Sequence, residues 1–133
     1  MSNSFIYRDI CQKVIRINDS PRFNNKANKV NQTKVYLVKH TIGNLPIYHY
    51  CVLFDKPVET RRQIHLCDFG PTRGMQISHV FENNIELTKM PSISLSIEDI
   101  KEFEKTLPQN YILLYRDCRH HTLDILNYCY PEP

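Results

Sequence analysis

A cysteine at the predicted start of the last helix is the residue of this chain best placed to act as a nucleophile. Cys118 follows the apolar run 111–115 and opens an amphipathic pattern that ends before Pro131. Asp117 is a good N-cap, which places Cys118 in the first helical turn. The unpaired backbone N–H groups and the positive dipole end there favour a thiolate over a thiol. The position therefore predicts a nucleophile, provided that a base reaches the sulfur.

A thiol nucleophile needs a general base, and among the six histidines His49 is the candidate. It lies in the apolar and aromatic run 47–54, where strand alternation places it on one face with Cys51 and Leu53. An inward-facing histidine on a central strand is suited to accept a proton from a cysteine. The competing interpretation is a core histidine bonded to a carbonyl group, and a single buried histidine fits that interpretation better.

A second histidine makes the base interpretation sharper. His65 lies in the middle of the next predicted strand, 61–69. If the two strands pair as a hairpin across the loop 55–60, the centre of the loop falls midway between the two histidines, which then lie opposite each other. Opposed Cβ atoms are about 4.5–5.5 Å apart, so one imidazole can orient the other. We therefore predict a triad of Cys118, His49 and His65, in which His65 holds the ring of His49.

The same two strands offer a metal-binding alternative. Four side chains carry it, as two pairs with the same spacing: His49 with Cys51, and His65 with Cys67. Together they form a set that zinc accepts. Side chains two residues apart on a flat strand diverge from a single ion, however. The two cysteines are therefore predicted to be small core residues, and the predicted site needs no metal and no cofactor.

The other histidines receive weaker assignments. His120 and His121 follow the nucleophile and are predicted at positions N3 and N4 of the helix, where they line the entrance of the site or adjust its charge. His40 and His79 lie at the ends of predicted elements, and we assign no role to either.

The order of the predicted elements indicates an α+β fold. A weakly amphipathic helix at 1–17 and a polar loop at 18–33 come first. Three strand signals joined by short links then indicate an antiparallel meander, at 34–40, 47–54 and 61–69. Residues 75–81 are a candidate further strand. A helix capped by Ser96 and stopped by Pro108 precedes the helix of the nucleophile. Strands first and helices later are typical of an α+β domain.

Length, charge and cysteine content narrow the class of protein. A chain of 133 residues with 41% hydrophobic residues suits one domain over 1–133. The formal charge of +3 is mild and dispersed, which argues against a nucleic-acid partner. The five cysteines form no disulfide framework and follow no signal peptide, so we expect free thiols in a reducing, cytoplasmic compartment. No apolar run approaches the roughly 18 residues of a membrane span, so any membrane contact is expected to be peripheral.

At these motifs the chain resembles the lecithin:retinol acyltransferase-like and H-rev-type branch of the NlpC-type, permuted papain-fold superfamily. That branch carries a His-Trp-Ala-Ile-Tyr box, where this chain has Tyr48-His-Tyr-Cys-Val-Leu-Phe54. Its Val-Ile-His-Leu strand corresponds to Gln63-Ile-His-Leu66. Its Asn-Cys-Glu-His-Phe segment corresponds to Asp117-Cys-Arg-His-His121. The resemblance covers residues 34–130, and the order His, His, Cys is the permuted order.

The resemblance implies a permuted papain-like fold, with an antiparallel meander packed against helices and the nucleophile at a helix N-terminus. It also implies a thiol hydrolase or acyltransferase that forms an acyl-enzyme on Cys118. The substrate would be an acyl-lipid, or a peptide or isopeptide, with an ester, thioester or amide carbonyl.

The chain also departs from the family pattern. Asp117 replaces Asn, Arg119 replaces Glu, and the sequence stops at Pro133 without the hydrophobic tail of many lipid-acting members. The alternatives are therefore a binding module that kept the fold and lost turnover, and a zinc-stabilised structural domain.

Overall fold

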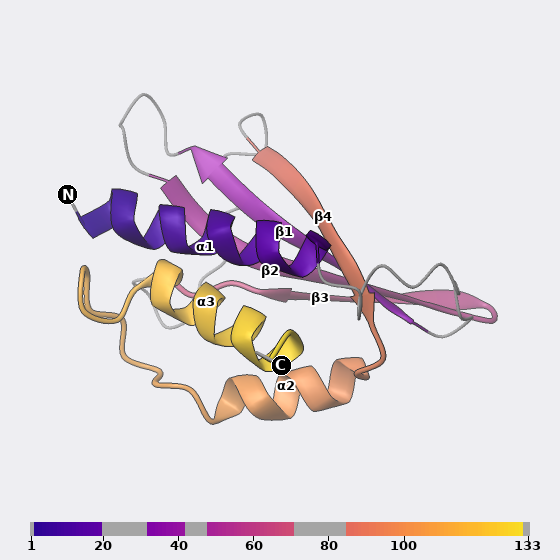
Figure 1. The fold of residues 1–133 in the computed structure, drawn as a ribbon. Coiled ribbons are helices and arrows are strands. Elements are labelled where there is room, and N and C mark those ends of the chain that lie inside the picture. The colour runs from indigo at the N-terminus through magenta and orange to yellow at the C-terminus, as the bar shows by residue number, and fades with distance from the viewer. Residues whose placement is uncertain (1, 20–31, 42–47, 71–84, 132–133) are drawn as a thin grey trace.

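The structure is a computed structural model that describes residues 2–19, 32–41, 48–70 and 85–131. The elements follow one another as α1 Ser2–Asp19, β1 Thr33–Thr41, β2 Tyr48–Val58, β3 Arg61–Cys67, β4 Ile85–Ile93, α2 Ile97–Lys105 and α3 Cys118–Cys129. The strands form one sheet in the order β3-β2-β1-β4, and each neighbouring pair is antiparallel (Figure 1). The predicted α+β class is confirmed.

One apolar core joins the sheet to the three helices. Its sheet members share one face, because directly paired residues such as Val35 and Phe54, or Val52 and Cys67, point to the same side. The helices contribute Ile10, Val14, Ile17, Ile97, Ile100, Ile125 and Leu126 to the same cluster. The helices therefore cover this face, and Figure 1 shows α1 and α3 running across it.

The two helix starts predicted from capping residues are confirmed. At the start of α2, the Ser96 hydroxyl accepts from the Asp99 N–H at 3.1 Å, and the Asp99 carboxylate accepts from the Ser96 N–H at 3.3 Å. This reciprocal pair satisfies two of the amide donors that a helix start leaves open. Asp117 caps α3, so Cys118 is its first residue, as predicted.

The strand β4 was not predicted from the sequence. Its residues before Met90 are all exposed, and it contains Pro91, so it lacks the apolar alternation that marks a half-buried strand. It lies at the edge of the sheet, where such a composition is tolerated. The candidate strand 75–81 and residues 20–31 of the predicted polar loop 18–33 lie outside the described residues, and residues 18–19 of that loop belong to α1. Among the residues that are described, no helix is long and apolar enough to cross a membrane.

The turn between β2 and β3 differs from the prediction and changes the register. Val58 pairs with Arg61, so the turn consists of Glu59 and Thr60 alone, and β2 continues through Pro57. Pro57 is accommodated because β1 pairs with β2 only as far as Asp55, which leaves no ladder on that side to interrupt.

The predicted alignment of His49 with His65 is therefore wrong. His65 pairs with Phe54, and the cross-strand partner of His49 is His40 on β1. Phe54 lies an odd number of positions from His49, so strand alternation places His49 and His65 on opposite faces of the sheet. The turn lies closer to the C-terminus than predicted, so every residue of β3 pairs with a different residue of β2. Because the observed partner of His65 lies an odd number of positions from His49, His65 also points to the other face of the sheet.

Candidate functional site

The turn before α3 and the N-cap of α3 fix the position of Cys118. The Asp117 carboxylate accepts from the Arg119 N–H at 3.1 Å and from the Leu114 N–H at 3.0 Å. The second bond supports Leu114 at a φ of 74°, a left-handed conformation that is unfavourable for a leucine. One carboxylate thus holds both the turn and the helix start, and Cys118 is left 5% exposed between them.

The two charged residues that flank Cys118 compensate each other. Arg119 forms an ion pair with Asp117, and both side chains are almost completely buried. Burial by itself raises the pKa of Asp117, but hydrogen bonds from Arg119 and Leu114 and the guanidinium charge outweigh it and lower that pKa. The carboxylate beside the nucleophile is therefore ionised, and the guanidinium offsets its negative charge.

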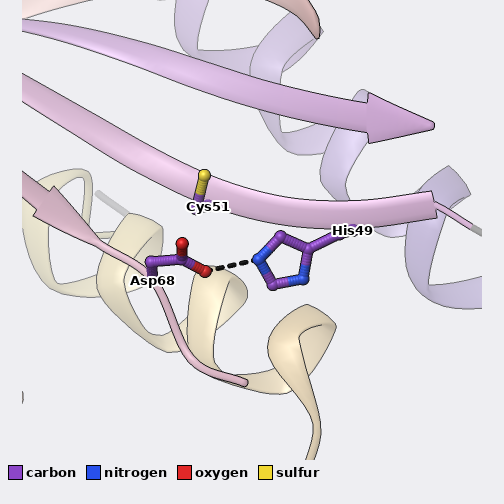
Figure 2. A group of neighbouring side chains, drawn as sticks. All are labelled: His49, Cys51 and Asp68. Carbon is purple, nitrogen blue, oxygen red and sulfur yellow. Dashed lines mark hydrogen bonds and ion pairs between the residues drawn. The ribbon is translucent and has the colours of Figure 1, made fainter. Parts of the chain in front are cut away.

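His49 lies between Cys118 and a carboxylate that sequence reasoning missed. Its Nε2 is bonded to Oδ1 of Asp68 (Figure 2), and the imidazole also hydrogen-bonds to Cys118. Burial lowers the pKa of His49, but the bonds to Asp68 and Cys118 and their charges prevail and raise it to about 9. At neutral pH the ring is therefore an imidazolium that contacts the sulfur on one side and a carboxylate on the other. The predicted proximity of Cys118 and His49 is confirmed.

Asp68 takes the place beside His49 that was predicted for His65. It follows the last residue of β3, and its side chain is fully buried. Val52 pairs with Cys67, so one step further along the antiparallel register brings Asp68 next to Cys51, close to His49. The sequence signal that could have found it is an acidic residue between two core residues, Cys67 and Phe69, at the end of a strand.

His65 lies in a different cluster. Its Nε2 bonds to Oε1 of Glu104 on α2 at 2.9 Å, and the Nε2 of His121 bonds to Oε2 of the same carboxylate at 3.1 Å. His121 is buried and its ring stacks on Phe69, with the centroids 4.9 Å apart.

The other histidines lie as follows. His120 is at N3, as predicted, and its Nδ1 accepts from the Asp117 N–H at 3.1 Å. The ring of His40 lies 6.3 Å from that of His49, centroid to centroid, in an edge-on arrangement. His79 is outside the described residues.

Two groups of side chains in the described residues are close enough to share a metal ion. Ligand atoms of His49, Cys51 and Asp68 all lie within 4.8 Å of one another, and Figure 2 shows this group at the start of β2. Ligand atoms of a second group, His65, Cys67 and Glu104, meet the same limit. The predicted four-residue set of His49, Cys51, His65 and Cys67 is therefore divided between two places.

Chemically, Cys118, His49 and Asp68 combine a thiol at a helix start, an imidazolium and an orienting carboxylate. Such a constellation is suited to nucleophilic attack by sulfur and to proton transfer by the imidazole. Comparison with known proteins gives no match: no family model, no curated protein and no solved structure is significantly similar to this chain.

Proposed function

We propose that this chain is a cysteine-dependent hydrolase or acyltransferase, with a permuted papain-like arrangement of its site, that forms an acyl-enzyme on Cys118. One observation carries the proposal. Cys118, the first residue of α3, is bonded to His49, and His49 is bonded to the buried carboxylate of Asp68. Nucleophile, proton carrier and orienting group thus follow in the sequence of contacts that thiol catalysis requires.

In the proposed reaction the proton rests on His49 before the substrate arrives. The Cys118 sulfur attacks the carbonyl carbon of an ester, thioester or amide, and a C–S bond forms while the carbonyl oxygen becomes an oxyanion. The backbone N–H of Cys118 is placed to donate to that oxygen. His49 then gives its proton to the leaving group as the bond to it breaks. Water or an acceptor alcohol or amine next attacks the thioester, and His49 takes its proton. The C–S bond then breaks, which releases the acyl product and regenerates the Cys118 thiolate.

The surface beside Cys118 favours an apolar acyl substrate over a charged peptide. Four successive side chains of the preceding turn are at least half exposed: Ile112, Leu113, Leu114 and Tyr115. Exposed apolar groups that are contiguous mark contact sites more often than scattered ones do. We therefore place an acyl-lipid first among the substrates and a peptide or isopeptide second, with any membrane contact peripheral.

A zinc-stabilised structural domain remains the second candidate, because the His49, Cys51 and Asp68 ligand atoms lie within 4.8 Å of one another. The two functions differ in what they require of Cys51. A metal at this place uses the Cys51 thiolate, whereas the acyl-enzyme mechanism does not involve that residue.

Acyl transfer to the enzyme tests the proposal directly. The purified protein is incubated with long-chain acyl nitrophenyl esters and acyl thioesters, and intact-mass spectrometry records the acyl adduct. We expect the adduct in the wild type and in Cys51→Ser, and none in Cys118→Ala. Cys129→Ala is the matched control, because Cys129 ends the same helix and is also 5% exposed. An adduct that persists in Cys118→Ala would overturn the assignment. Loss of the adduct in a folded Cys51→Ser would also contradict the mechanism, because the mechanism does not involve Cys51.

A further inference from the structure

A second polar cluster lies on the helix-covered face of the sheet and is not used by the proposed mechanism. Its centre is the Glu104 carboxylate of α2, which is bonded to His65 of β3 through one oxygen and to His121 of α3 through the other. The thiol of Cys67, two residues after His65 on β3, also hydrogen-bonds to Glu104. Three side chains, two from β3 and one from α3, thus converge on the one carboxylate of α2.

Three of these groups present the donor atoms of a zinc site. Ligand atoms of His65, Cys67 and Glu104 lie within 4.8 Å of one another. Zinc binds sulfur at about 2.3 Å and nitrogen or oxygen at about 2.0–2.2 Å, so tetrahedral ligands are about 3.3–3.8 Å apart. Only small movements of the side chains are needed to reach that spacing. Glu104 of α2 lies over both strand residues, so their side chains converge on it although they are two residues apart on one strand.

The charges of the cluster also suit a divalent cation. Burial raises the pKa of Glu104, but hydrogen bonds from His121 and His65 outweigh it and lower that pKa to about 2, so the carboxylate is ionised. Burial, together with the neighbouring carboxylate, raises the pKa of the Cys67 thiol. A bound dication counteracts this rise in the pKa of Cys67, because its charge balances one thiolate and one carboxylate beside a neutral imidazole.

The surroundings provide access and a second shell. A cavity of about 380 Å³ is lined by His65, Glu104 and His121, among others, and leaves room for a water molecule as the fourth ligand. His121 is 3% exposed, and its Nδ1 has no hydrogen-bond partner among the described residues. Its Nε2 holds the oxygen of Glu104 that His65 does not contact. Such outer contacts orient carboxylate ligands in metal sites.

We propose that His65 Nε2, Cys67 Sγ and the Glu104 carboxylate bind one Zn²⁺ ion, with a water from the cavity as the fourth ligand and His121 orienting Glu104. On binding, the His65–Glu104 hydrogen bond is replaced by two bonds to the metal. His65 binds as its Nδ1–H tautomer, so Nε2 gives up the proton that it shared with Glu104, and the Cys67 proton leaves to solvent. The ion links α2 to β3. Through His121 it also steadies α3, the helix that begins with Cys118, although the zinc site does not depend on the proposed catalysis.

Metal content and cobalt spectroscopy of the whole chain test this proposal. The protein is stripped with a chelator, reloaded with Zn²⁺ or Co²⁺ and freed of excess ion. We expect one ion per chain and, with Co²⁺, a near-ultraviolet thiolate-to-metal band. Both should be lost in Cys67→Ser and in Glu104→Gln. The affinity of His121→Ala should fall about 10–100-fold, as expected for an outer-shell contact.

The matched control is Cys51→Ser, because Cys51 has the same spacing from a strand histidine in the other group. It should keep both the ion and the band. Far-ultraviolet circular dichroism shows whether each variant is folded. If Cys67→Ser does not fold, the metal content of Glu104→Gln tests the proposal instead. The proposal is overturned by a wild type that retains far less than one ion per chain. It is also overturned if folded Cys67→Ser or Glu104→Gln keeps the ion, or if folded Cys51→Ser loses it. None of these results bears on acyl-enzyme formation at Cys118.

Discussion

At the scale of single residues, the chemistry of the candidate site depends on what holds the His49 ring. A carboxylate and an imidazole are different orienting groups, because only the carboxylate brings a negative charge. The buried Asp68 both fixes the ring and keeps it protonated, and its bond to His49 is among the leading causes of the pKa of about 9. The proton required by the leaving group is therefore on His49 at neutral pH.

Replacing that charge tests the role of Asp68. Asp68→Asn keeps the size of the side chain, and we expect the pKa of His49 to fall from about 9 towards its ordinary value of 6.5. The rate of acyl-enzyme formation should fall by about 10²–10⁴-fold, as expected when the orienting carboxylate of a triad is neutralised. NMR titration of the imidazole and single-turnover kinetics measure the two effects. Asp55→Asn is the control, because Asp55 is also buried and ion-paired but contacts Arg62. A fall in rate without a change in the His49 titration would contradict the assignment.

Thiol reactivity separates Cys118 from the other cysteines. We expect iodoacetamide to alkylate Cys118 faster than any other cysteine below neutral pH, because Cys118 opens a helix and contacts the imidazolium of His49. Cys129 is equally exposed, but burial raises its pKa to about 12, so it should react slowly. Peptide mapping by mass spectrometry gives the rate for each residue. His49→Ala should remove the advantage of Cys118. Faster labelling of Cys11 or Cys129 in the wild type would show that Cys118 is not activated.

At the scale of elements, the helix starts could be predicted from the sequence and the hairpin register could not. Ser96 and Asp117 predict the starts of their helices from the local sequence alone, because a cap acts within one helical turn. The β2–β3 turn has no such signal. Asp55 and Pro57 are typical turn residues, yet both lie in β2, where the carboxylate of Asp55 pairs with Arg62 across the hairpin. Tertiary contacts therefore decided the register, and with it which acid lies beside His49.

The start of α3 provides a prediction at the same scale. Asp117→Asn keeps an N-cap, but it removes the carboxylate that forms an ion pair with the buried Arg119. We expect a loss of about 1–3 kcal/mol in the free energy of unfolding, measured with urea. Arg119→Gln added to Asp117→Asn should recover part of that loss, because the unpaired buried charge is then gone. A double variant as unstable as the sum of the two single variants would show that the pair is not coupled.

At the scale of the whole molecule, two polar clusters lie close to α3. Alternation assigns His49 and Cys51 to one face, and His65 and Cys67 to the face that the helices cover. Asp68, next to Cys67 in the chain, lies with the first group. The helix α3 contributes to both clusters, with Cys118 in its first turn and His121 one turn later. The end of β3 and the first two turns of α3 thus contribute residues to both the proposed catalytic site and the proposed zinc site, around a shared core.

The raised pKa of His49 couples the candidate site to the stability of the whole fold. The folded protein retains the His49 proton up to about pH 9, whereas the unfolded chain retains it only up to about pH 6.5. Between these values the folded state binds more protons at His49, so its contribution to the free energy of unfolding falls as the pH rises. This contribution is fully present below pH 6.5, the ordinary value, and is lost on passing through pH 9. Its upper limit is about 3 kcal/mol.

Urea unfolding at a series of pH values, in wild type and His49→Gln, isolates this contribution. We expect the stability difference between the two proteins to shrink steadily from pH 6 to pH 9.5, because only the wild type carries the titrating ring. The hydrogen bonds of His49 to Cys118 and to Asp68 both help to raise its pKa. Measuring Cys118→Ala in the same series shows how much of the pH-dependent stability comes from the bond to the thiol and how much from the bond to Asp68. A stability difference that grows with pH would mean that the folded state holds His49 in its neutral form. The proton for the leaving group would then have to come from the thiol during the reaction, as in a neutral Cys–His pair, and Asp68 would act on the orientation of the ring alone.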